Sequence, residues 1–166
     1  MSVILPPQVP LANNKHKTYF NLLCNTVQQY LDSVIIDFTG YDELVNAYMN
    51  VKNYETDKNF ELSKSFNAWY EYISDITNVI QNQFLDAETD KLQIVSEKSI
   101  LANEKSVSAG DRKANADPDV ILARKRRNAL KSFYDALTAR QNFCEKAFYQ
   151  CKHCCMDFDK DKREQQ

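Results

Sequence analysis

Residues 104–137 read EKSVSAGDRKANADPDVILARKRRNALKSFYDAL, and this stretch separates two long segments with helical periodicity. Gly110 favours a break, because glycine weakens a helix interior. The residue before a proline is biased away from helical geometry, so Asp117 is expected to cap a new helix whose first residue is Pro118. We call residues 108–118 the elbow and expect the preceding helix to stop there.

Apolar residues recur every seven positions on both sides of the elbow. The first series is Phe66, Ile73, Ile80, Ala87, Ile94 and Leu101, and the second is Ala123, Leu130, Leu137, Cys144, Cys151 and Phe158. Such spacing is typical of a seam between packed helices, and a short connector makes the two helices antiparallel. The sequence therefore predicts an all-α fold, an elongated, coiled-coil-like helical hairpin with long helices at about 60–108 and 118–157.

The hairpin is not expected to be equally well packed along its length. The companion positions of the first seam start with Trp69 and Ile76 and become polar at Asp90, Glu97 and Glu104. The apolar stripe therefore narrows toward the elbow, where we predict the weaker packing.

Additional helices are expected before the hairpin. Apolar residues at three- and four-residue spacing predict one helix from about Lys15 to Val34, and Thr39 is expected to cap a second. The domain organisation we predict is a Pro-rich extended arm at 1–14, a single helical domain at 15–158 and a charged tail at 159–166.

Composition argues against an enzyme. Two glycines, Gly40 and Gly110, cannot form the closely spaced glycine loops that hold phosphates or dinucleotides. The chain has two histidines and no motif of a known nucleophile. We therefore predict no catalytic residue and no cofactor.

The apolar start of the chain does not predict a membrane segment. It carries no basic region, contains three prolines, and no run approaches the roughly 20 apolar residues of a spanning helix. We expect a cytoplasmic protein, in the host cell cytoplasm if it is phage-encoded, with its thiols reduced.

Charge is distributed unevenly. Residues 1–111 hold 8 Lys/Arg and 15 Asp/Glu, a net charge of −7, while residues 112–140 hold 8 and 3, a net charge of +5. We call residues 112–140 the basic zone. A basic zone on an acidic chain favours contact with a polyanion or with the acidic part of another copy.

Six residues of the basic zone are the predicted nucleic-acid-binding site: Arg112, Lys113, Arg124, Lys125, Arg127 and Lys131. Their side chains can neutralise successive phosphates. The alternative is a solvated face, or ion pairs with Glu97 and Glu104 across the hairpin. Phe133 and Tyr134 could stack on bases, but their phase in the seam favours the core instead.

The cysteine-rich end, with CKHCC at residues 151–155, contains a C-x-x-C pair and a histidine, which are possible zinc ligands. A structural zinc site needs a second pair of ligands at comparable spacing, and only Cys24 remains outside this helix. Cys144 and Cys151 lie on the apolar stripe, where thiols behave as small hydrophobic groups. We predict no metal site.

The pattern around the elbow resembles that of the UvsY-type recombination mediators of phages. It consists of S-V followed by R-K-A, then D-P-x-V-I, then an A-R-K-rich helix that continues into a seam. The matching residues are Ser106, Val107, Arg112, Lys113, Ala114, Asp117, Pro118, Val120, Ile121, Ala123, Arg124, Lys125, Leu130, Lys131, Tyr134 and Leu137. The resemblance covers roughly residues 66–150; the segment before Phe60, the Pro-rich arm and the cysteine-rich end have no counterpart in the family.

The resemblance implies a homo-oligomeric, non-enzymatic protein that binds single-stranded DNA. It also implies two protein partners, a recombinase and a single-strand-binding protein, because mediators load the former onto strands coated by the latter. The alternative function is a helical structural, scaffolding or adaptor protein of a phage, which binds another protein through the seam at 66–101 and the N-terminal arm.

Overall fold

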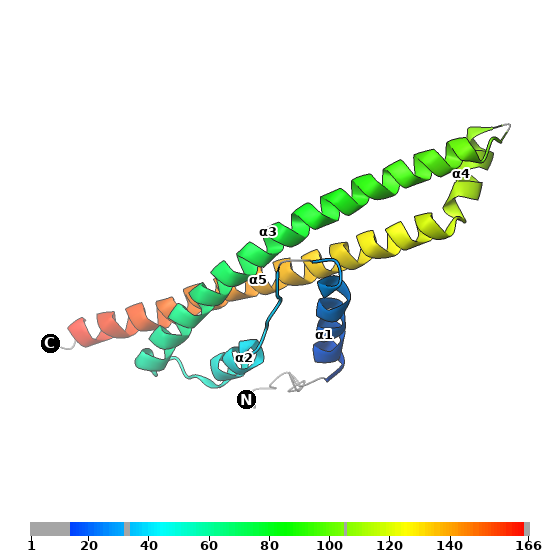
Figure 1. Cartoon of the computed structure of the whole chain (residues 1–166). Coiled ribbons are helices and arrows are strands. Elements are labelled where there is room, and N and C mark those ends of the chain that lie inside the picture. The colour runs from blue at the N-terminus through cyan, green and yellow to red at the C-terminus, as the bar shows by residue number, and fades with distance from the viewer. Residues whose placement is uncertain (1–13, 32–33, 105, 165–166) are drawn as a thin grey trace, which may run out of the picture.

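The computed structural model describes residues 14–31, 34–104 and 106–164, and this part of the chain contains five helices and no strand. The helices are α1 (Asn14–Gln28), α2 (Tyr41–Asn50), α3 (Thr56–Leu101), α4 (Val107–Asn115) and α5 (Pro118–Glu164). Figure 1 shows α3 and α5 running side by side in opposite directions, with α2 near the start of α3, α1 beside the middle of α5 and α4 at the other end. The predicted all-α fold is confirmed.

The two predicted seams meet along the hairpin. Phe66, Ile73 and Ile80 of α3 are fully buried, as are Leu130 and Leu137 of α5. The antiparallel register is marked by ring contacts at one end, where Phe66 and Phe143 lie 5.9 Å apart between ring centroids. The heptad spacing therefore predicted the buried face of each helix at these positions, while the side chain of Phe158 lies outside the part that the structure describes.

Burial declines toward the elbow, as the polar companion positions predicted. Along the α3 series, Ala87 is still buried, Ile94 is half-buried and Leu101 is 77% exposed. Ile100 and Val107, beside the connection from α3 to α4, are 76% and 80% exposed. The apolar core therefore holds the half of the hairpin that carries α1 and α2.

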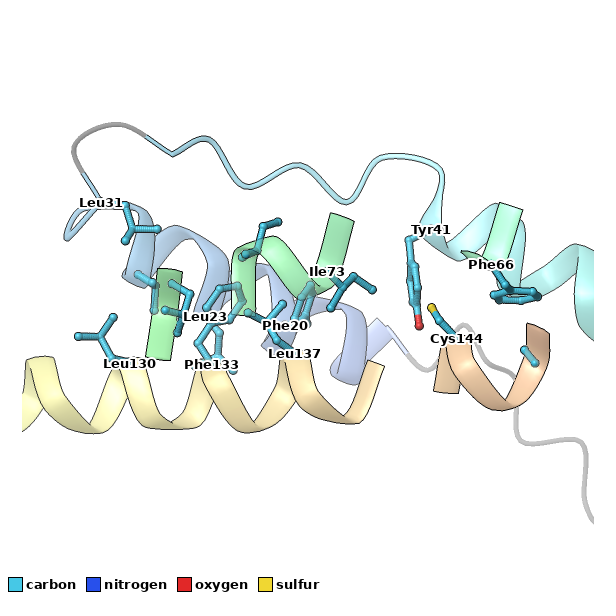
Figure 2. Packing of buried hydrophobic residues seen from close by; sticks show 14 of the residues in the cluster. Phe20, Leu23, Leu31, Tyr41, Phe66, Ile73, Leu130, Phe133, Leu137 and Cys144 are labelled. Atoms are coloured by element: carbon cyan, nitrogen blue, oxygen red, sulfur yellow. The ribbon is translucent and has the colours of Figure 1, made fainter. Parts of the chain in front are cut away.

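Helix α1 completes this core by packing on α5 (Figure 2). Phe20 and Leu23 of α1 face Leu130, Phe133 and Leu137 of α5, and the rings of Phe20 and Phe133 lie 5.6 Å apart between centroids. Phe133 is fully buried, so it belongs to the core as its phase indicated.

Several boundaries differ from the predicted ones. Helix α1 ends at Gln28, whose side chain donates to the Val34 carbonyl and accepts from the Ile36 amide, and so holds residues 34–36 beside the end of this helix. Gly40, with a φ of 86°, precedes α2, while the predicted cap Thr39 donates its amide to Asp37. Only Asn14 of the predicted arm is described, and it lies in α1.

The largest differences lie at the elbow and at the end of α5. Helix α3 ends at Leu101, and α4 occupies most of the segment that was predicted to be a break. Helix α5 runs on to Glu164, so most of the predicted charged tail is helical.

Candidate nucleic-acid interface

The elbow is a short helix that packs closely against α3. Ser106 caps α4, because its hydroxyl accepts from the Ala109 amide at 3.3 Å. Gly110 lies within α4, where a Cβ atom would stand 2.9 Å from Ser99 Oγ and 3.1 Å from the Ser99 carbonyl oxygen. The glycine allows close approach of two helices and does not end a helix, so its predicted role was wrong.

The start of α5 follows the prediction. The carboxylate of Asp117 accepts from the Asp119 amide at 2.9 Å, and Pro118 is the first helical residue. Lys98 of α3 pairs with Asp117 at 3.1 Å and with Asp119 at 2.6 Å, which ties the end of α3 to the start of α5. The hydrogen bond from Asp119, followed by Lys98, lowers the pKa of Asp117.

Three of the six predicted binding residues are engaged in ion pairs. Lys113 on α4 pairs with Glu104 at 3.0 Å. On α5, Arg127 pairs with Glu88 of α3 at 2.8 Å, and Lys131 pairs with Asp135 at 2.6 Å within the same helix. Their charges are partly compensated before any ligand arrives.

The other three form no ion pair with any residue that the structure describes. Arg112 is exposed on α4 and donates to the Ser108 carbonyl. Arg124 is half-buried and donates to the neutral side chain of Asn115, and Lys125 is exposed. These three cations are the uncompensated part of the basic zone.

The basic side chains of α5 do not share one face. A helix advances about 100° per residue, so Arg124, Arg127 and Lys131 form a stripe while Lys125 lies about 100° from Arg124. Arg112 belongs to a different helix. The structure thus brings the predicted residues to one end of the hairpin but spreads them around it.

Arg126 is not one of the six predicted binding residues, and the structure shows it engaged with α3. It crosses to α3 and pairs with Asp90 at 3.1 Å, and its guanidinium lies 5.8 Å from the Tyr30 ring centroid. Arg127 next to it lies 5.3 Å from the Phe84 ring centroid. The Nε atoms of both arginines are buried without an acceptor.

The carboxylates that neutralise the basic zone are mostly not the predicted ones. Glu104 does pair with a lysine of the elbow, but Glu97 accepts from Gln93 of its own helix. Glu88 and Asp90 take its place across the hairpin. Because α3 ends earlier than expected, each residue of α5 faces a position nearer the start of α3.

The thiols form no metal site among the residues that the structure describes. Cys144 and Cys151 are buried, and Cys155 directs its thiol to the Thr56 carbonyl at 3.5 Å. Burial raises the pKa of Cys144 and that of Cys151 to about 11. These thiols therefore pack as small apolar groups.

We predict that Cys154 reacts with a thiol reagent well before Cys144 and Cys151 at pH 7.5. Cys154 is partly exposed, whereas the other two are buried and protonated at this pH, and only the thiolate is nucleophilic. Timed labelling of the native protein followed by peptide mass mapping measures the order. Simultaneous labelling of all three in the native state would contradict the burial described here, and labelling in denaturant serves as the control.

None of the helices in the described ranges is long and apolar enough to cross a membrane.

Comparisons with models of protein families, with curated proteins and with solved structures gave no match to this chain.

Proposed function

We propose that this protein is a non-enzymatic, homo-oligomeric accessory protein that binds single-stranded DNA, a recombination mediator of the phage type. The observation that supports the proposal is the set of uncompensated cations, Arg112 in the elbow and Arg124 and Lys125 in the first turns of α5, within a basic zone of net charge +5. By resemblance, its protein partners are a recombinase and a single-strand-binding protein, in the host cell cytoplasm.

The spread of these cations favours a single strand over a duplex. They lie on two helices and on different faces of α5, so a rigid duplex cannot reach all of them along one straight path. A single strand can bend around the elbow and place successive phosphates against each cation. Phe133 is buried and therefore cannot stack on bases, and Tyr134 is half-buried against the core, so the proposed binding rests mainly on phosphate contacts.

Charge reversal tests the interface. We expect the triple variant Arg112→Glu, Arg124→Glu and Lys125→Glu to lose affinity for a labelled oligonucleotide and to flatten its salt dependence. Each lost phosphate contact removes about 0.7 from the slope of log K against log salt, or about 2 in all. Fluorescence anisotropy at several salt concentrations measures the slope.

The matched control reverses Lys52, Lys146 and Lys152, which are exposed and lie at the other end of the hairpin. It changes the net charge equally and should keep most of the slope. Equal losses in both variants would mean that only net charge matters. Absence of binding by the natural sequence at low salt would overturn the proposed function.

A second variant removes the internal competitors. Glu88 and Asp90 occupy the guanidinium groups of Arg127 and Arg126, so a phosphate must displace a carboxylate to bind there. We expect Glu88→Gln with Asp90→Asn to raise affinity for single-stranded DNA more than Glu71→Gln with Asp75→Asn. The second pair makes the same change in net charge on an exposed part of α3. An equal rise in both would show that Arg126 and Arg127 do not contact the strand.

A specific observation favours a second candidate function, a helical module that binds another protein. Ile100, Leu101 and Val107 expose large aliphatic side chains beside the connection from α3 to α4, and Leu92 is 58% exposed nearby on α3. The seam proposed for this contact extended over 66–101, but α5 covers its first part and α2 also packs on α3. A protein partner would therefore meet only the part beyond Ala87.

The two candidates make different predictions for purified material. A protein-binding module stays in a stoichiometric complex after nuclease treatment, and Leu101→Ser with Val107→Ser should release the partner. A DNA-binding mediator keeps its affinity for the oligonucleotide in that variant.

A further inference from the structure

A cavity of about 520 Å³ lies away from the elbow, between α1, the segment 36–39, the start of α2 and α5. Its walls include the apolar side chains of Phe20, Ile36 and Phe38. Arg140 of α5 is the one basic residue among those described that line it. The cavity takes no part in the interface proposed above.

Arg140 is held in a fixed position in the wall of this cavity. Its guanidinium carbon lies 3.4 Å from the centroid of the Phe20 ring and 5.8 Å from that of Tyr41. The side chain donates to the Ala136 carbonyl at 3.4 Å, a long hydrogen bond. Stacking against two rings leaves the group oriented before a ligand binds.

The charge of Arg140 is not compensated by an ion pair with any described residue. Its Nε atom is buried without an acceptor. Burial lowers the pKa of Arg140, while the nearby Tyr41, Cys24 and Asp42 raise it. An arginine remains charged in proteins, so this guanidinium, held by one long hydrogen bond and two aromatic rings, can still pair with an anion.

We propose that this cavity binds a small monocarboxylic acid with an apolar body, with the carboxylate on the guanidinium of Arg140. The planar fork of an arginine matches a carboxylate with two parallel hydrogen bonds. Asp37, Asp42 and Glu43 also line the cavity, so the paired hydrogen bonds from Arg140 must outweigh their repulsion, which grows with the charge of the anion. Phe20, Ile36 and Phe38 provide apolar surface for the body of the ligand.

The test uses the full chain and 3-phenylpropionate as the probe. We expect saturable binding by titration calorimetry, and binding of the uncharged 3-phenylpropanamide that is at least about tenfold weaker. Arg140→Met should weaken binding of the acid by a similar factor and leave binding of the amide unchanged. Arg140→Lys should be intermediate, since an ammonium group cannot form the paired hydrogen bonds.

Two controls make the outcome decisive. Lys146→Met removes an exposed cation from the same helix and should not change binding. Circular dichroism and thermal unfolding verify that each Arg140 variant folds, and the lysine variant carries the test if the methionine variant does not. Equal binding of acid and amide, no saturable binding of the acid at millimolar concentrations, or tighter binding of inorganic phosphate would overturn the proposal.

Discussion

Replacing Phe133 with alanine is expected to lower the free energy of unfolding by about 3–5 kcal/mol. The ring is fully buried where α1 meets α5, and it contacts Phe20 at 5.6 Å between centroids. The truncation loses the free energy gained by transferring the ring from water into the core. It also leaves a cavity that α1 and α5 cannot close without moving. Urea denaturation followed by circular dichroism measures the loss.

The control is Tyr149→Ala on the same helix, where the side chain is 61% exposed. It should cost less than about 1 kcal/mol, because little apolar surface returns to water. A Phe133 variant as stable as this control would mean that α1 does not pack on α5 as described. The Phe133 variant should also expose α1 to faster amide hydrogen exchange, since Phe133 is one of the α5 residues on which α1 packs.

Replacing Gly110 with valine is expected to lower the free energy of unfolding by about 1–3 kcal/mol. A Cβ atom at this position would stand 3.1 Å from a backbone oxygen of Ser99, which no side-chain rotation relieves. The higher helix propensity of other residues is worth at most about 1 kcal/mol, so the steric term decides the sign. Urea denaturation measures the change, and hydrogen exchange should locate it at α4 and the end of α3.

Ser108→Val is the matched control, because Ser108 is exposed on the same helix. Ser99→Gly in the Gly110→Val background should recover only part of the loss, since it removes the hydroxyl but leaves the carbonyl. Full recovery would show that the backbone contact is unimportant.

Gly110 also marks the limit of what the sequence could predict. The heptad series and the Asp117-Pro118 start of α5 depend on local spacing and stereochemistry, and both were correct. A glycine inside a polar segment is ambiguous, because it can end a helix or let another helix approach. Only the position of Ser99 in space distinguishes these two roles.

The sequence indicated where the basic residues of the candidate site lie, but not which carboxylates pair with them. Charge counting located the basic zone, and the phase of Phe133 assigned it correctly to the core. The partners of Arg126 and Arg127 depend on the register of α3 against α5, and α4 sets that register. Because the predicted end of α3 was too late, Glu97 was expected to pair across the hairpin, whereas the observed partner of Arg127 is Glu88.

The length of the hairpin has a mechanical consequence. A helix of 46 residues such as α3 spans about 70 Å at 1.5 Å per residue. The elbow is the end of a lever arm whose pivot is the aromatic core around α1. Phe133 of that core lies about 22 Å along α5 from Pro118, so a tilt of about 5° there carries the elbow about 2 Å sideways. Small adjustments in the packing of Phe20 and Phe133 therefore set how far the basic zone can reach.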